Sequence, residues 1–339
     1  MTTQPRVTVL IDSYNYGHFI EEAIESVAAQ DYPADQFEIV VVDDGSTDDT
    51  GERVKKFGSR VRYLYKANGG QASAFNLGFA EARGEIVALL DADDYWLPGK
   101  LRRVAQEFEK HPEAGMVYHR LQELDMQSGQ RREGSFTGIS GFVARNRKDL
   151  LRYILYPTSA LAFRRRCIEP LLPIPEGLTI QADSHLSGLV IFVAPVVAID
   201  EALAVYRVHG ANLFHSPGAQ FNADRTRRRV ETFKTLAEGM KEWLAANGRD
   251  VSQRDVRAFL AQWQLTWEAD EFTIATPGRL RIFWHLWRYN YYFAPRLSWR
   301  HMLVNYINAF GSLILGYRHL HFIDEWIAAV KQRIRPSSR

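Results

Sequence analysis

The sequence predicts an α/β fold, with a mainly parallel sheet flanked by helices, followed by a helical C-terminal region. Three apolar runs in the first 95 residues carry this prediction: Val7–Ile11, Ile39–Val42 and Ile86–Leu90. They are rich in β-branched residues and are separated by helix-like stretches, which is typical of buried parallel strands. Each run leads into acidic or polar residues. Because ligands bind outside the carboxyl ends of such strands, these polar residues are the first candidates for a functional site.

The elements expected in residues 1–217 alternate along the chain. Strands are expected at residues 6–13, 37–43, 61–66, 85–91, 116–118, 159–163 and 193–199. Amphipathic helices are expected at residues 19–30, 48–57, 71–82, 98–111 and from about 182. Ser46-Thr47-Asp48 fits an N-cap, Gly84 a helix stop, and Pro98 the first turn of a helix. Residues 120–146 are polar and rich in Gly and Ser, which predicts a hairpin or a mobile loop.

Beyond Pro217 the pattern changes to long helices, expected at 220–247, 253–274, 278–292, 298–317 and 321–334. We therefore expect an α/β domain over residues 1–217 and a helical domain over residues 218–339. The single cysteine, Cys167, excludes an internal disulfide and suits a reducing compartment. The first apolar run has strand character rather than that of a signal peptide, so we expect the chemistry to take place in the cytoplasm.

Charge is distributed unevenly between the two ends of the chain. Residues 279–339 contain ten Lys or Arg against Asp324 and Glu325, a net charge of +8. Since the whole chain carries +2, the preceding 278 residues carry −6. Acidic residues are therefore concentrated in the predicted α/β domain, where a metal site is expected, and basic residues in the tail.

Asp91-Ala92-Asp93 is a D-x-D motif that directly follows an apolar strand. The triplet alone is weak evidence for a metal site, but its position at a strand end, before Asp94, is more specific evidence. Carboxylate oxygens there can hold Mg²⁺ or Mn²⁺ against a diphosphate, and the cation offsets negative charge on a departing nucleoside diphosphate. The alternative is an acidic turn that is simply solvated.

Two further segments follow predicted strands. Asp43-Asp44-Gly45-Ser46 is either a turn with capping residues or a site where one carboxylate contacts a base imino hydrogen or a ribose hydroxyl. Asn68-Gly69-Gly70-Gln71 opens a helix, where free backbone N–H groups of Gly70 and its neighbours could meet phosphate. A plain turn with an N-cap explains that segment equally well.

These segments together resemble the successive motifs of glycosyltransferase family 2, whose members are inverting enzymes of the GT-A fold. The matching segments are Val7–Asn15, Asp43–Thr50, Asn68–Gly78 and Gly84–Leu97, and the similarity covers about residues 5–215. The resemblance implies a donor-binding half at about 1–118 and an acceptor-binding, catalytic half at about 119–217. It also implies that Ser13, Tyr14 and Asp44, or its neighbour Asp43, surround the nucleotide base.

The resemblance implies further roles along the chain. Asp91, with Ala92, would lie near the ribose, and Asp93 would bind Mn²⁺ or Mg²⁺. Asp183 stands in the place of the family's catalytic segment and is the candidate base that takes a proton from an acceptor hydroxyl. Tyr206–Asn212 resembles the family's closing motif, in which Arg207 would meet the diphosphate and His209 would join the metal or diphosphate site.

The sequence departs from the family pattern at three positions. Asp12 stands where the family often has Pro or Thr, which adds an acid beside the base pocket. Phe75 replaces a common Arg, which removes one possible phosphate contact, and Ala182 replaces the usual Glu before the base. The metal ligand and the base are retained, whereas the identity of the donor is left open.

The C-terminal tail is basic and aromatic. Residues 280–326 contain thirteen of the chain's 42 aromatic residues, and apolar residues from Trp299 to Tyr317 follow a three–four spacing. The uncharged stretch from His301 to Tyr317 is short and polar for a membrane span. One interpretation is a surface resting on anionic lipid or a lipid-linked acceptor, at the inner face of the cell membrane. The other is helices packed on the catalytic domain or on a second subunit in a homo-oligomer. No recognised motif supports nucleic-acid binding.

The function expected from these observations is transfer of a sugar, with inversion, from a nucleoside diphosphate-sugar. The donor is expected to be a UDP-sugar and the acceptor a glycan or lipid-linked hydroxyl in cell-surface polysaccharide or glycolipid synthesis. A sugar nucleotidyltransferase is an alternative, although its Gly-rich loop does not follow the first strand. A dinucleotide dehydrogenase is disfavoured because no G-x-G-x-x-G follows that strand. A catalytically inactive GT-A-like binding protein would lose Asp93 or Asp183, and both are present.

Overall fold

A computed structural model describes residues 6–134, 136–210, 212, 223–275, 278–293 and 299–315. The chain divides into two compact units. The first comprises Met1–Phe221 and Glu238–Trp243, and the second comprises Asn222–Ala237 and Leu244–Arg339. The first unit thus contains the predicted α/β domain and a short piece of a later helix.

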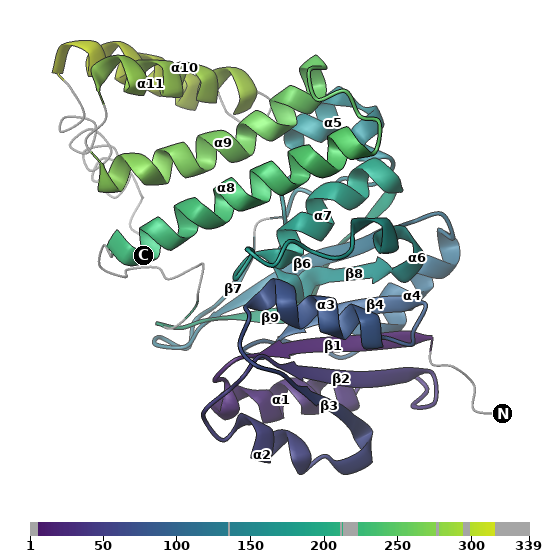
Figure 1. Cartoon of the computed structure of the whole chain (residues 1–339). Coiled ribbons are helices and arrows are strands. Elements are labelled where there is room, and N and C mark those ends of the chain that lie inside the picture. Colours follow the sequence, from purple (N-terminus) through teal and green to yellow (C-terminus); the bar gives the residue numbers. More distant parts are fainter. Residues whose placement is uncertain are drawn as a thin grey trace, which may run out of the picture. The chain divides into compact units, whose positions relative to one another are not determined.

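The first unit is built around a nine-stranded mixed sheet (Figure 1). Its strands are β1 (Val7–Ser13), β2 (Phe37–Asp43), β3 (Val61–Tyr65), β4 (Ile86–Asp91), β5 (Tyr95–Trp96), β6 (Met116–Asp125), β7 (Arg131–Glu133), β8 (Leu161–Arg164) and β9 (Val196–Val208). The strand order is β3-β2-β1-β4-β8-β6-β9-β5, and β7 pairs with β6. The helices are α1 (Gly17–Ala28), α2 (Thr50–Lys55), α3 (Gln71–Glu81), α4 (Lys100–Lys110), α5 (Arg147–Arg152), α6 (Arg165–Ile168) and α7 (Ala182–Val193). The predicted fold class, a mainly parallel sheet with flanking helices, is confirmed.

The parallel half of the sheet follows the apolar runs. β1 pairs in parallel with β2 and with β4, and β2 pairs in parallel with β3. The side chains of Val9–Ile11, Val40–Val42 and Val87–Leu90 are fully or almost fully buried. Strands covered on both faces need continuous apolar sequence, which is why these runs do not alternate.

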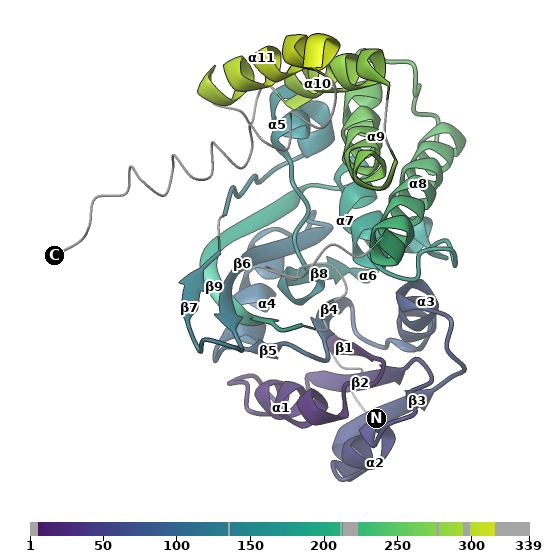
Figure 2. The same ribbon diagram turned by 90° about the vertical axis from the view of Figure 1, so that its left-hand side faces the viewer.

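The other half of the sheet is mixed, and here two predicted boundaries are wrong. β6 continues to Asp125 and forms a hairpin with β7, which settles the choice between a hairpin and a mobile loop for this part of residues 120–146. β9 was expected to end at Ile199 but continues to Val208 beside β6 (Figure 2). The reason is a bulge: the pairing register shifts on either side of Arg120, so that the charged pair Asp200-Glu201 is left outside the ladder.

Gly84 lies where the first residues of β1 and β4 pass close to each other. A Cβ atom on this residue would lie 2.4 Å from the backbone nitrogen of Thr8 and 2.8 Å from the carbonyl oxygen of Ile86. The N–H of Gly84 also donates a hydrogen bond to the Thr8 hydroxyl (2.9 Å). The sequence predicts Gly84 as a helix stop, and the structure adds that no side chain fits there.

The second unit is helical. Its elements are α8 (Ala223–Ala246), whose residues 238–243 group with the first unit, α9 (Arg254–Ile274), α10 (Arg279–Phe293) and α11 (Trp299–Leu315). These four agree with the predicted helices, while the helix predicted at 321–334 lies outside the described residues. α10 packs on α9 and α11. Among the described residues, no helix is both long enough and apolar enough to cross a membrane.

The close approach at Gly84 predicts a measurable loss of stability. Gly84→Ala should lower the free energy of unfolding by about 1–3 kcal/mol, because the new methyl group meets backbone atoms that cannot move independently. The matched control is Gly210→Ala, where a Cβ atom would have no neighbour within 4 Å among the described residues. Urea unfolding of both variants measures the difference, and equal stabilities would contradict the tight packing at Gly84.

Candidate active site at the carboxyl ends of the parallel strands

The carboxyl ends of three neighbouring strands meet at one edge of the sheet. Ser13 of β1 lies opposite Asp43 of β2, and Asp12 lies opposite Asp91 of β4. The polar residues that follow the three apolar runs are therefore brought together. Ser13 is buried and its hydroxyl lacks a hydrogen-bond partner within the described part of the chain, whereas the adjacent Tyr14 is exposed.

Asp43 and Asp44 are both buried and both have protein partners. Asp43 accepts hydrogen bonds from the backbone N–H of Ser46 (2.8 Å) and the hydroxyl of Tyr63 (2.6 Å). Asp44 forms an ion pair with Lys66 (2.6 Å). These contacts correspond to the turn-stabilising alternative for this segment. Contact of either carboxylate with a nucleotide base stays a prediction of the family resemblance.

The backbone at Gly70 does not offer the free N–H groups that the sequence suggested. The N–H groups of Gly69 and Gly70 donate to the carboxylate of Asp44, at 3.0 and 2.6 Å. The next N–H, that of Gln71, donates to the carbonyl oxygen of Thr179 (3.0 Å). These donors already have acceptors within the protein, and a phosphate contact at the start of α3 stays a prediction.

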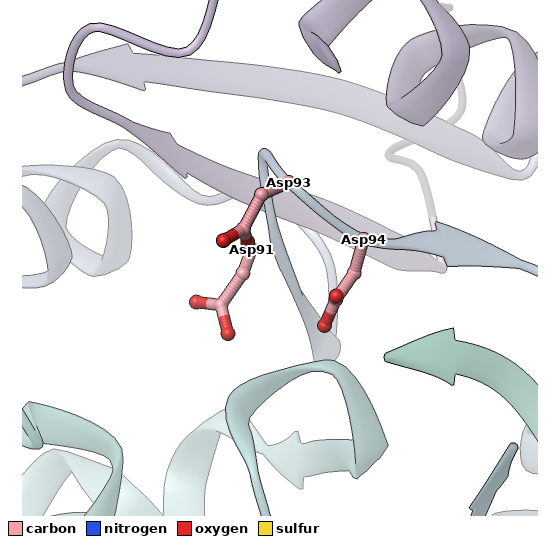
Figure 3. A group of neighbouring side chains, drawn as sticks. All are labelled: Asp91, Asp93 and Asp94. Carbon is pink, nitrogen blue, oxygen red and sulfur yellow. The ribbon is translucent and has the colours of Figure 1, made fainter. Parts of the chain in front are cut away.

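Asp91, Asp93 and Asp94 form the acidic cluster predicted from the D-x-D motif. Oxygen atoms of the three carboxylates lie within 4.8 Å of one another. Figure 3 shows the three side chains, with Asp91 at the end of β4 and Asp93 and Asp94 on the loop that leads to β5. Ala92, between them, is buried. The three carboxylates nevertheless have different partners.

Asp94 is fully buried and holds the loop in place. Its two oxygens accept hydrogen bonds from the hydroxyl of Ser159 (2.6 Å) and the backbone N–H of Arg207 (2.9 Å). The carbonyl oxygen of Ser159 accepts a hydrogen bond from the buried ammonium group of Lys100 (2.6 Å). Burial raises the pKa of Asp94 and lowers the pKa of Lys100, so each group depends on these partners.

Arg207 is also a part of this support. Its side chain is buried and donates hydrogen bonds to the carbonyl oxygens of Asp93 and Asp94, and it forms an ion pair with Glu22 (2.6 Å). β9 continues through Arg207, and this position brings the guanidinium group to the acidic loop. Contact of Arg207 with a diphosphate stays a prediction of the family resemblance.

Asp93 and His209 lie side by side. The Nε2 atom of His209 is 3.0 Å from Oδ2 of Asp93, and the amide of Asn212 is 3.5 Å from the same oxygen. A carboxylate and an imidazole nitrogen form a donor set that suits Mn²⁺ and is compatible with Mg²⁺. Asp91 stands next to them in the acidic cluster. The residues present therefore fit the predicted metal ion.

The electrostatics of the cluster favour a bound cation. Burial, followed by repulsion from Asp12 and Asp93, raises the pKa of Asp91 well above its ordinary value. Burial also raises the pKa of Asp12 to about 7, although part of Asp12 reaches solvent. Carboxylates that repel one another in this way are stabilised in their charged forms by a divalent cation.

Asp183, the candidate base, lies in the first turn of α7 and is buried. It accepts hydrogen bonds from the backbone N–H of Ser184 (2.8 Å) and from the hydroxyl of Thr158 (3.2 Å). Burial outweighs these hydrogen bonds and raises the pKa of Asp183 to about 6. Such a carboxyl is mostly ionised at neutral pH, yet binds a proton more readily than an exposed aspartate.

Gln71 connects the base with the sheet edge. Its amide nitrogen lies 3.4 Å from Asp12 and 3.5 Å from the hydroxyl of Thr158, and its amide oxygen accepts a hydrogen bond from the N–H of Ala182 (3.0 Å). Repulsion from Asp183 contributes to the raised pKa of Asp12. The candidate base and the acidic cluster therefore belong to one electrostatic environment.

Several of these residues were not identified from the sequence as site residues. Thr158, Ser159 and Gln71 stand in segments that the family resemblance covers, but their polar side chains alone carry no signal. Asp12 follows the first apolar run and departs from the family pattern, but the sequence assigns it no particular role. The position of Asp12 at the end of an apolar strand, opposite the D-x-D motif, was the available clue.

Comparison with known proteins agrees with this geometry. Residues 8–171 match the family model described as Glycosyl transferase family 2. An uncharacterized glycosyltransferase of Nostoc sp. is 37% identical over 220 residues, which cover 61% of this chain and 66% of the relative. An uncharacterized glycosyltransferase of Rickettsia typhi is 40% identical over 100 residues, which cover 30% of this chain and 31% of the relative. The chain thus spans at most about two thirds of the length of these relatives.

Two solved structures share the fold at low sequence identity. Residues 1–349 of S. aureus TarS in complex with UDP match with a TM-score of 0.55 and 21% identity, covering 92% of both chains. A mannosyltransferase from Pyrobaculum calidifontis, in complex with GDP-Man and Mn²⁺, matches with a TM-score of 0.51 and 21% identity, covering 93% of this chain and 88% of that chain. From the family match, the similarity to the Nostoc protein and the shared fold, we conclude that the chain belongs to glycosyl transferase family 2.

Proposed function

We propose that this protein transfers a sugar from a nucleoside diphosphate-sugar to an acceptor hydroxyl, with inversion at the anomeric carbon and with the help of a divalent cation. The observation that supports the proposal is that two groups share one electrostatic environment. The first is the cluster of Asp91 and Asp93 with the adjacent His209, which we propose to hold the cation, and the second is the buried carboxyl of Asp183, which we propose as the base. Membership of the family sets aside the nucleotidyltransferase alternative.

The donor is proposed to be a UDP-sugar. TarS, which shares the fold, has been solved with UDP and with UDP-GlcNAc, whereas the Pyrobaculum mannosyltransferase has been solved with GDP-Man. In this chain, the exposed ring of Tyr14 is available for stacking on a base, and the buried hydroxyl of Ser13 is available for a hydrogen bond. Asp44, with Asp43, would border the same pocket, and Asp91 would approach the ribose.

Asp93 and His209 would hold Mn²⁺ or Mg²⁺. When bound, the cation offsets the negative charge that develops on the departing diphosphate. The protein's own contribution is to hold the carboxylate of Asp93 in place. Asp94 and Arg207 do this by fixing the loop through hydrogen bonds to its backbone and to the neighbouring strands.

Asp183 is proposed to act as the general base. An acceptor hydroxyl oxygen attacks the anomeric carbon while its proton passes to the carboxylate of Asp183. The bond from the anomeric carbon to the diphosphate oxygen breaks on the opposite face, which inverts the configuration. Thr158 donates a hydrogen bond to Asp183 and thereby orients the carboxylate. The acceptor is proposed to be a glycan or lipid-linked hydroxyl of a cell-surface polysaccharide or glycolipid.

Asp93→Asn tests the cation site. The variant should lose the Mn²⁺-dependent increase in melting temperature that UDP produces, because a neutral amide binds a divalent cation far more weakly than a carboxylate. Thermal unfolding with UDP, with and without Mn²⁺, measures this effect. Asp31→Asn is the matched control, since Asp31 is an exposed aspartate whose partner is Arg102. A full Mn²⁺-dependent increase in the Asp93 variant would contradict the assignment.

Asp183→Asn separates catalysis from binding. Donor binding, followed by calorimetry with UDP-sugars and Mn²⁺, should stay nearly normal, while transfer falls by roughly a hundredfold or more because the proton acceptor is gone. Loss of donor binding together with transfer would instead make Asp183 a binding residue. If the Asp183→Asn variant transferred sugar at an unchanged rate, another residue would be the general base.

The raised pKa of Asp183 predicts a pH dependence. Because the base must be ionised, kcat/KM should rise about tenfold per pH unit at low pH. It should level off above a pH of about 6, the pKa of Asp183. The hydrogen bond from Thr158 lowers this pKa, so Thr158→Val should shift the inflection to higher pH. The pH profiles of the two proteins measure the shift, and identical inflections would contradict the contact.

A further inference from the structure

The hairpin of α10 and α11 exposes large apolar side chains. The described part of the chain has twelve large hydrophobic residues that are exposed to solvent, and nine of them lie on these two helices. We call these nine residues the outer face: Leu280, Trp284, Trp287, Tyr291, Trp299, Leu303, Ile307, Phe310 and Leu313. Leu280 is 62% exposed, Leu303 50% and Ile307 57%, values that are unusual for aliphatic residues in adjacent helical turns.

The outer face is continuous across both helices. Its residues recur every three or four positions along α10 and along α11, which places them on one side of each helix. The two stripes meet where the rings of Trp287 and Phe310 lie 6.3 Å apart. An apolar patch of this kind on a protein surface marks a site of interaction.

Polar side chains, in contrast, lie inside the hairpin. Asn290 is buried, donates a hydrogen bond to the carbonyl oxygen of Met302 (2.9 Å) and accepts one from Asn305 (2.9 Å). His285 is buried against Glu268 of α9 at 3.1 Å. The buried residues of the hairpin therefore include polar Asn290 and His285 beside apolar Ile282 and Ala309, while large apolar side chains lie outside. An outer side of this kind suits helices that contact lipid.

The charge of the segment identifies the kind of lipid surface. Residues 279–315 contain five arginines and no Asp or Glu. Arg281 and Arg288 pair with Glu271 and Glu268 of α9, while Arg279 is exposed beside the outer face. Basic residues next to an apolar face attract a helix to anionic headgroups, and Trp and Tyr side chains prefer the boundary between headgroups and acyl chains.

We infer that the outer face of α10 and α11 binds the surface of an anionic lipid bilayer, with the hairpin lying in the plane of the interface. α11 has 17 residues, and at 1.5 Å per residue it is about 26 Å long, which is shorter than the hydrocarbon core. A two-fold dimer through the same face would bring like-charged segments together with no acid in either, which disfavours a second copy of the chain as the occupant.

The test is sedimentation of the full chain with vesicles. We expect binding to vesicles of equal parts phosphatidylcholine and phosphatidylglycerol, weaker binding to phosphatidylcholine alone, and weakening of the former in high salt. The variant Trp284→Ser/Leu303→Ser/Ile307→Ser should bind anionic vesicles at least about tenfold less. Its matched control is Tyr65→Ser/Met126→Ser, which removes exposed apolar side chains from the first unit and should bind normally.

Two results would overturn the inference. One is sedimentation of the wild-type chain with anionic vesicles no greater than without vesicles. The other is equal binding by the triple variant and its control. Light scattering without lipid gives a further check: a stable dimer that the triple variant converts to a monomer would assign the outer face to a second copy. Folding of each variant is followed by its helical circular dichroism, and no readout depends on sugar transfer.

Discussion

The rest of the site depends on one buried carboxylate, Asp94. A fully buried aspartate is stable only if its oxygens have partners, and here these come from Ser159 and from the backbone of Arg207. The requirement ties two segments that are distant in sequence to the loop after β4. These contacts fix the backbone of the loop, and with it the position of the neighbouring Asp93 beside His209.

A similar division is seen along the sheet edge. Asp43 and Asp44 have several hydrogen-bond donors each, whereas the hydroxyl of Ser13 has none within the described structure. Polar residues at the same sheet edge thus differ in whether their side-chain atoms are already hydrogen-bonded within the protein. The distinction depends on backbone amides, such as that of Gly70, whose direction is fixed by the conformation of the turn.

The sequence predicted the parallel half of the sheet well because burial on both faces requires unbroken apolar runs, as in Val7–Ile11. It failed at β9, where Asp200-Glu201 interrupts the apolar pattern and the bulge that accommodates them leaves no local signal. The D-x-D cluster was predictable because motif and strand end coincide. The burial of Asp183 and its contact with Thr158 were not, because they depend on how α7 packs in three dimensions. The contacts of Arg207 were not, since they depend on where β9 ends in three dimensions.

The bulge in β9 also limits how this protein can vary in length. Side chains alternate between the two faces of a strand, so adding or removing one residue reverses the direction of every side chain beyond it. Arg207 lies a few residues past the bulge in β9. Without the bulge, the strand would end at Asp200-Glu201. A single insertion or deletion between the bulge and Arg207 would turn the guanidinium away from the acidic loop. Chain length is therefore constrained in this short part of β9.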